Sequence, residues 1–226
     1  MNGMIGNCTG ITSLAGLEGW NVGNVTTMRG MFYGCKLSSI DAILNWNLGN
    51  VLDMLSAFFM AEIPSADFSN WNVGINNTTT IRDGFMTQFG QEAKLTAENA
   101  VLDLRGWNST VIRNLGHRAL NFSNVSVVRM DDWDLVNYTG RIASGGEHNY
   151  DDLFCATLNG AEIYPPIIYQ SFDMSHFTLS HDTILRFINQ LPEVEEPRTM
   201  TIGDTNLAKI NDDEIAIAID KNWSIS

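Results

Sequence analysis

The chain has 226 residues, of which 44% are hydrophobic and only 17% charged, so it can bury a substantial core and is not expected to be disordered. Its formal net charge of −13 disfavours nucleic acid or an anionic lipid surface as a partner. No apolar run of about 18 residues is present, which predicts no membrane insertion, and the first residues lack the basic and apolar regions of a signal peptide.

The N-terminal residues resemble the interior of a repeat rather than its start. Residues 4–8 (MIGNC) align with residues 31–35 (MFYGC), and no amphipathic segment precedes them. An uncapped end of a repeat stack presents apolar surface and an open sheet edge. We therefore expect a protein partner, or a second copy of the chain, to pack on the N-terminal end.

A repeat organises residues 1–140. The unit WNVGNVTTMRGMFYGC occupies residues 20–35, and weakened copies follow at spacings of about 25 residues. Tryptophans recurring at one phase favour a buried ladder; if exposed, they would form a stripe on which sugars stack. The side chains that define the repeat, and that we expect in the core, are Trp20, Met28, Phe32, Cys35, Trp46, Met54, Phe58, Trp71, Trp107 and Trp133.

Each unit reads as one short strand followed by a helical turn. Residues 38–44 and 101–104 suit strands, and Met28, Met31 and Phe32 have the spacing of a helix that faces the core. This layout predicts an α/β fold, a leucine-rich-repeat-type solenoid of about five degenerate repeats of ~25 residues. The longer spacing between Trp71 and Trp107 holds either an insertion around residues 88–94 or a degenerate repeat.

The C-terminal part changes character. Residues 141–176 form a degenerate repeat or loop region, and residues 177–226 read as a helix–strand–helix–strand unit that caps the stack. We expect a helix at 181–191 capped by Ser180, a strand at 198–202, a helix at 212–221 opened by a capping box at Asn211, and a strand at 223–226.

Few polar side chains in the sequence are candidates for catalysis or metal binding. One candidate binding loop could hold a cation or an acid–base pair, although a solvated loop is the simpler and favoured interpretation; its residues are Glu147, His148, Tyr150, Asp151 and Asp152. Cys155 could be paired with His148 as nucleophile and base, but no third group orients them. The three cysteines read as small buried hydrophobes. We predict no catalytic residue, no cofactor and no metal site.

The unit at 20–35 resembles the repeat of BspA-like leucine-rich-repeat surface proteins, the mycoplasma-type repeat of unknown function. The segments 179–184, 201–210, 213–218 and 221–224 resemble the C-terminal part of such proteins, including phage-encoded members. The resemblance implies surface display, adhesion and binding of proteins or glycans, and it implies no catalytic residues. It covers residues 1–60 best and fades towards residue 140.

These observations predict a non-enzymatic binding or structural module. The leading interpretation is a phage virion protein (decoration, fibre or tail) that attaches to a protein or a host surface, where a glycan is a further candidate partner. The alternatives are a fragment of a bacterial cell-surface adhesin, or an enzyme or enzyme accessory that uses the 147–155 loop. The expected location is accordingly a virion surface or the cell exterior.

Overall fold

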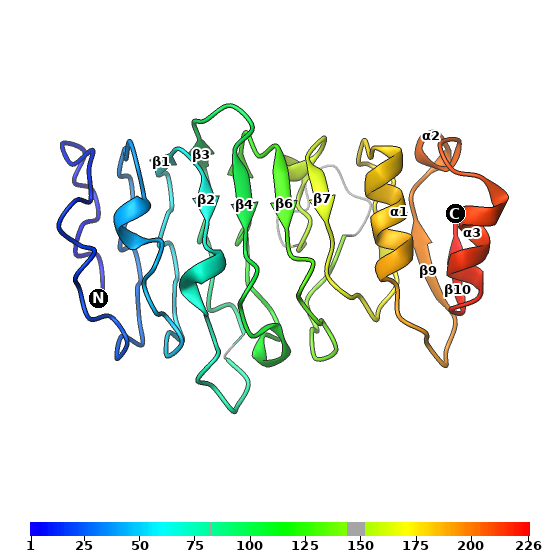
Figure 1. The fold of residues 1–226 in the computed structure, drawn as a ribbon, viewed down its shortest axis with the longest axis horizontal. Helices are drawn as coiled ribbons and strands as arrows, with labels where there is room; N and C mark the ends of the chain where they lie inside the picture. Colours follow the sequence, from blue (N-terminus) through cyan, green and yellow to red (C-terminus); the bar gives the residue numbers. More distant parts are fainter. Residues whose placement is uncertain (82, 144–151) are drawn as a thin grey trace.

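The chain forms a row of coils stacked along its longest axis, with the N-terminus at one end and the C-terminal helices at the other (Figure 1). The computed structural model describes residues 1–81, 83–143 and 152–226. Within these residues every strand pairing is parallel. No helix there has the length and apolar character needed to cross a membrane.

Two parallel sheets run along the row. One contains β1 (Glu62–Ile63), β3 (Ala93–Leu95) and β5 (Phe122–Ser123); the other contains β2 (Ala66–Asp67), β4 (Val101–Asp103), β6 (Val127–Arg129) and β7 (Glu162–Tyr164). Neighbouring strands come from successive units, so that Asp67 pairs with Asp103, and Asp103 with Arg129. The coils are therefore stacked in register. Their assignment to the leucine-rich type stays a prediction.

Tryptophan side chains join each coil to the coil before it. The indole Nε1–H donates to a carbonyl oxygen that lies three residues before the preceding tryptophan. These bonds run from Trp46 to Leu17 (3.1 Å), from Trp71 to Ile43 (2.9 Å), from Trp107 to Phe68 (2.9 Å) and from Trp133 to Leu104 (2.7 Å). The last three of these bonds are buried, so each satisfies a backbone acceptor that water cannot reach, whereas the bond to Leu17 is partly buried.

The other repeat-defining side chains lie in the core with one exception. Phe32 and Phe58 stack with ring centroids 5.0 Å apart, and the buried set also includes Met28, Cys35 and Met54. Trp20 was expected in the buried ladder, but it is 38% exposed. Its ring lies nearly parallel to that of Trp46 at 6.2 Å, so one face is packed while much of the rest of the ring remains in solvent.

The helical turn predicted around residues 28–32 is absent. The amides of Met28, Gly30 and Phe32 donate to the next coil, at Asp53, Leu55 and Ala57, over 2.8–2.9 Å. Gly30 has a positive φ of 55°, which a right-handed helix does not allow. The apolar spacing therefore arises from tight turns whose hydrogen bonds join neighbouring coils.

The strand predicted at residues 38–44 is also wrong. A short 3-10 helix, η1 (Asp41–Ile43), occupies this stretch. Its first amide, that of Asp41, donates to the hydroxyl of Ser39 at 2.9 Å, and the amide of Ile43 donates to the carbonyl oxygen of Ile40 at 2.9 Å. The backbone of residues 39–43 therefore bonds locally, within a turn, and does not pair with a neighbouring strand in the described part of the chain. Similar turns follow at η2 (Ser69–Trp71), η3 (Ser109–Val111) and η4 (Ala156–Leu158).

The extra residues between Trp71 and Trp107 do not lie at 88–94. The amide of Gln88 donates to His117 within the regular stack, and residues 93–95 form β3. The added length lies instead in residues 74–80 and 96–99, because contacts on either side of both segments remain in register with the preceding coil. Residues 74–80 project from one side of the row (Figure 1).

The C-terminal unit contains a third parallel sheet, in the order β10 (Trp223–Ile225), β9 (Arg198–Thr201) and β8 (Phe172–Asp173). Helix α1 (His181–Gln190) is capped by Ser180 and α3 (Asp212–Ile219) by a capping box at Asn211, as predicted. A short helix α2 (Asp204–Leu207), which the sequence did not predict, lies between them. Trp223 repeats the indole bond of the stack, donating to Pro192 at 2.9 Å.

Candidate functional site

The candidate binding loop falls mostly outside the described residues, which leaves Glu147, His148, Tyr150 and Asp151 without a structural account. Asp152 is described, and its side chain is only 3% exposed. Its carboxylate accepts a hydrogen bond from Arg141 Nε at 2.9 Å. This ion pair, buried at Asp152 and exposed at Arg141, fixes the chain near Arg141, and a ligand could not reach Asp152 without moving it.

The thiol of Cys155 is buried, and burial raises its pKa. Its Sγ lies 3.5 Å from the carbonyl oxygen of Leu120 and 3.2 Å from the hydroxyl of Thr157. A nucleophilic cysteine needs access and a thiolate, and this environment opposes both. No group of three histidine, cysteine, aspartate or glutamate side chains with metal-binding geometry occurs in residues 1–81, 83–143 and 152–226.

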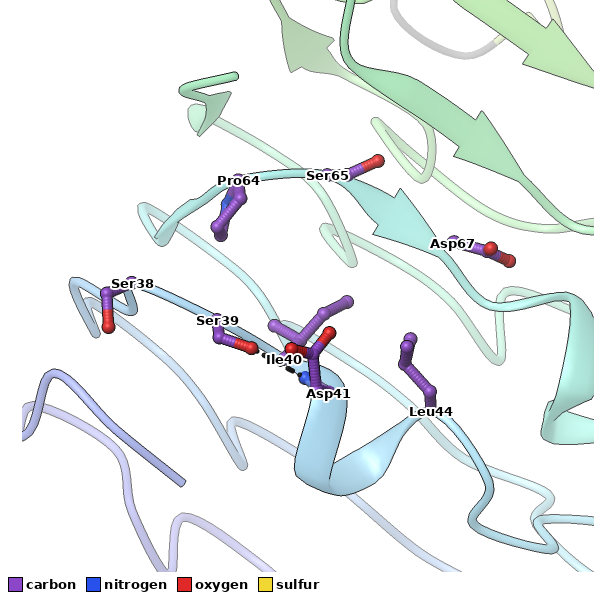
Figure 2. Close-up of a pocket in the computed structure, with 8 residues that line it drawn as sticks. All are labelled: Ser38, Ser39, Ile40, Asp41, Leu44, Pro64, Ser65 and Asp67. Carbon is purple, nitrogen blue, oxygen red and sulfur yellow. Dashed lines mark hydrogen bonds between the residues drawn. The ribbon is translucent and has the colours of Figure 1, made fainter. Parts of the chain in front are cut away.

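A groove lies at the free edge of the β2–β4–β6–β7 sheet. It encloses about 350 Å³, and Figure 2 shows its two walls. The segment leading into η1 and the turn itself form one wall, and the segment that becomes β2 forms the other. The lining residues are Ser38, Ser39, Ile40, Asp41, Leu44, Pro64, Ser65 and Asp67.

The groove exists because the sheet stops at β2. The amide of Phe68 donates to Asp103 on β4 at 2.8 Å, so alternation along the strand turns the amide of Asp67 towards residues 38–41. No backbone hydrogen bond joins residues 64–67 to residues 38–41. Pro64 lacks an amide hydrogen, and the Ser65 hydroxyl is bonded to Val101 on the other side at 3.0 Å. The strand edge facing the groove is therefore unpaired.

Two carboxylates give the groove its charge. Asp67 Oδ1 accepts hydrogen bonds from the amide and the hydroxyl of Ser69, at 3.1 and 2.7 Å, which hold this carboxylate in place. The carboxylate of Asp41 receives no hydrogen bond or ion pair from the described part of the chain. The base of the groove is apolar, with Ile40 buried and Leu44 half-buried. The arrangement suits a positively charged group on an aliphatic stem.

Sequence reasoning missed these residues. Their serines and aspartates are spread over two units, and no local motif joins them. The one usable signal was Pro64 between Ile63 and Ser65, since a proline inside a strand-like stretch marks a sheet edge.

The structure is thus a row of parallel coils joined by indole bonds, with an open groove where one sheet ends. The family model described as "Mycoplasma protein of unknown function, DUF285" matches residues 1–114, and the chain belongs to this family. The matched residues include the coils that carry the groove. No curated protein and no solved structure matches the chain.

Proposed function

We propose that this chain is a non-enzymatic binding and structural module, and that the groove beside β2 binds an extended segment of a partner protein. The observation that carries the proposal is the unpaired edge of β2 between the carboxylates of Asp41 and Asp67. An extended peptide can pair with an open strand edge through its backbone, while side-chain pockets supply specificity. A lysine or arginine side chain of that segment would lie over Leu44 with its charge near the two carboxylates.

Charge complementarity supports a basic partner. The chain carries a net charge of −13, and at the groove the carboxylates of Asp41 and Asp67 favour a basic segment over an acidic one. Binding of this kind depends on ionic strength, because exposed charges are screened over about 8 Å at physiological salt.

The biological setting we propose is a phage particle, with the chain as a decoration, fibre or tail protein that attaches to a partner or to a host surface. Support for this setting is the resemblance of the C-terminal segments to phage-encoded BspA-like members. The exposed side chains of Met4, Ile11 and Trp20 in the first coil support a second contact there, with a partner or another copy of the chain. The leucine-rich-type solenoid class belongs to the same proposal.

A fragment of a bacterial cell-surface adhesin is the alternative that membership of a Mycoplasma-labelled family favours. Fractionation of native material followed by proteomics separates the two settings. Recovery with virus particles at a fixed copy number supports the virion protein, whereas recovery in the cell envelope supports the adhesin. A turnover that disappears on alanine substitution of Glu147 and Asp151, with the fold intact, would instead revive the enzyme interpretation.

The groove itself is tested with a blocked, extended peptide of alternating valine and threonine around a central lysine. We expect it to shift the amide resonance of Asp67 in the full chain. A peptide with norleucine in place of lysine keeps the aliphatic stem and loses the charge, and it should bind more weakly. The double variant Asp41→Asn, Asp67→Asn should weaken lysine-peptide binding by about tenfold, consistent with up to ~1 kcal/mol for each exposed ion pair.

Glu98 and Glu196 supply a charge-matched control, because both are exposed and lie outside the groove. The variant Glu98→Gln, Glu196→Gln removes the same net charge and should retain peptide binding. Equal loss in the two double variants would mean that only overall charge matters, and absence of any shift at Asp67 would refute the groove as a peptide site.

A further inference from the structure

A second hollow lies on the side of the row from which residues 74–80 project. It is open to solvent and has a volume of about 430 Å³. Three coils contribute to it, and its lining residues are Thr80, Arg113, Val136, Asn137, Tyr138 and Thr139. It shares no residue with the groove beside β2.

The two walls of this hollow are tied together through the backbone of Arg113. Its carbonyl oxygen accepts hydrogen bonds from the amides of Thr139 at 2.8 Å and Gly140 at 3.1 Å. The Thr139 hydroxyl donates to the same oxygen at 3.2 Å. Tyr138, the residue before Thr139, is buried in the core and also lines the hollow. The shape of the hollow is thus set by the fold before any ligand arrives.

The guanidinium of Arg113 has no hydrogen bond or ion pair within residues 1–81, 83–143 and 152–226. Several other arginines are bonded to carboxylates: Arg29 to Asp53, Arg105 to Asp103, Arg141 to Asp152 and Arg186 to Glu162. In a chain with twice as many acids as bases, an arginine left without a carboxylate beside a hollow offers a binding position for an external one.

The remaining groups suit a polyhydroxylated ligand. The Asn137 side-chain amide donates a hydrogen bond to the carbonyl oxygen of Thr110 at 2.9 Å, which orients the side chain. Its side-chain oxygen can then accept a hydrogen bond from a ligand hydroxyl. Thr139 has spare lone pairs, and the hydroxyl of Thr80 has no partner in the described part of the chain. Val136 is 53% exposed and provides an apolar contact for the C–H face of a sugar ring.

We infer that this hollow binds an acidic sugar, such as a uronic or sialic acid residue of a glycan. Arg113 binds the carboxylate, Thr80, Asn137 and Thr139 bind hydroxyl groups, and Val136 contacts the ring. An acidic peptide is disfavoured because the lining presents neither an unpaired strand edge nor an apolar groove for a peptide. The inference goes beyond the proposed peptide groove and does not depend on it, since the two sites share no residue.

The test uses the full chain with methyl-labelled valine and threonine, titrated with glucuronate, galacturonate and N-acetylneuraminate. Glucose, galactose and N-acetylmannosamine serve as matched neutral sugars. We expect at least one sugar acid to shift the Val136 and Thr139 methyl resonances, and its neutral counterpart to bind at least tenfold more weakly. Arg113 is exposed, so Arg113→Gln should leave the fold unchanged and weaken the acid at least tenfold, whereas Arg113→Lys should lose less.

Glu98→Gln, outside the hollow, should bind the sugar acid like the unmodified chain. Absence of shifts with all three sugar acids overturns the inference. It is equally overturned if a blocked glutamate peptide shifts the same methyls and the sugars do not, because the ligand would then be a peptide carboxylate. Equal affinity for a sugar acid and its neutral counterpart would also overturn the inference, because Arg113 would then make no contribution to binding the carboxylate. Loss of lysine-peptide binding at the β2 groove would not affect any of these results.

Discussion

The indole bonds between coils make a quantitative prediction for Trp71→Phe. Trp71 is fully buried, and its Nε1–H donates to the carbonyl oxygen of Ile43 at 2.9 Å. Phenylalanine keeps an aromatic ring there but leaves that oxygen buried without a donor, at a cost of ~1–3 kcal/mol. The smaller ring also leaves roughly 40 Å³ unfilled, which at ~24 cal/mol per Å³ adds about 1 kcal/mol. We expect the free energy of unfolding to fall by ~2–4 kcal/mol.

Trp20→Phe is the matched control, because Trp20 occupies the equivalent repeat position but is 38% exposed, and its indole nitrogen makes no hydrogen bond within the described residues. That change should cost less than about 1 kcal/mol. Urea unfolding followed by circular dichroism measures both, since tryptophan fluorescence would change with the substitution itself. For a chain of this size, 1 kcal/mol corresponds to ~2–4 °C, so Trp71→Phe should also lower Tm by roughly 5–15 °C. Equal losses in the two variants would refute the reasoning.

Two further changes test packing and capping. Gly90→Ala places a methyl group against the ring of Phe122 and should lower the free energy of unfolding in urea by ~1–3 kcal/mol. Gly10→Ala is the control, because its methyl group meets no neighbouring atom, and it should leave the stability nearly unchanged. Similar losses at both sites would contradict the contact with Phe122. The amide of Asn211, and secondarily His181, lowers the pKa of Glu214. Its carboxylate therefore stabilises α3 above the pKa of an unfolded glutamate, and this stabilisation disappears as pH falls through the lower folded pKa. The protection factors of the α3 amides, corrected for the intrinsic pH dependence of exchange, should fall over that acidic window, and Glu214→Gln should remove this fall. Protection factors that do not change with pH in the unmodified chain would contradict the prediction.

The C-terminal unit was predictable because its signals are local. Ser180 accepts the amide of Thr183 and opens α1, and Asn211 exchanges hydrogen bonds with Glu214 at the start of α3. A side chain three residues from its partner is visible in a short window of sequence. Both helices accordingly begin where the sequence placed them.

Inside the coils the same reasoning failed, because the hydrogen bonds are not local. Met28, Met31 and Phe32 have helical spacing, yet the amides of Met28 and Phe32 donate to residues about one repeat away. Periodicity reports which side chains face the core, and it does not report whether the backbone bonds within a helix or between coils. The groove was hidden for the same reason, since Asp41 and Asp67 become neighbours only through stacking.

Both proposed sites lie where the regular stacking of the coils is interrupted. At the β2 edge, η1 and Pro64 interrupt the ladder, which leaves backbone groups and two carboxylates facing an open groove. Near Arg113, the extra residues 74–80 bring Thr80 beside a later coil and enclose a hollow. A regular stack satisfies its backbone internally and presents a uniform surface, so irregular units are where unpaired groups can meet a ligand. This predicts that shortening 74–80 to the length of the preceding unit would close the hollow and abolish sugar-acid binding, while the amide shift of Asp67 with the lysine peptide persists.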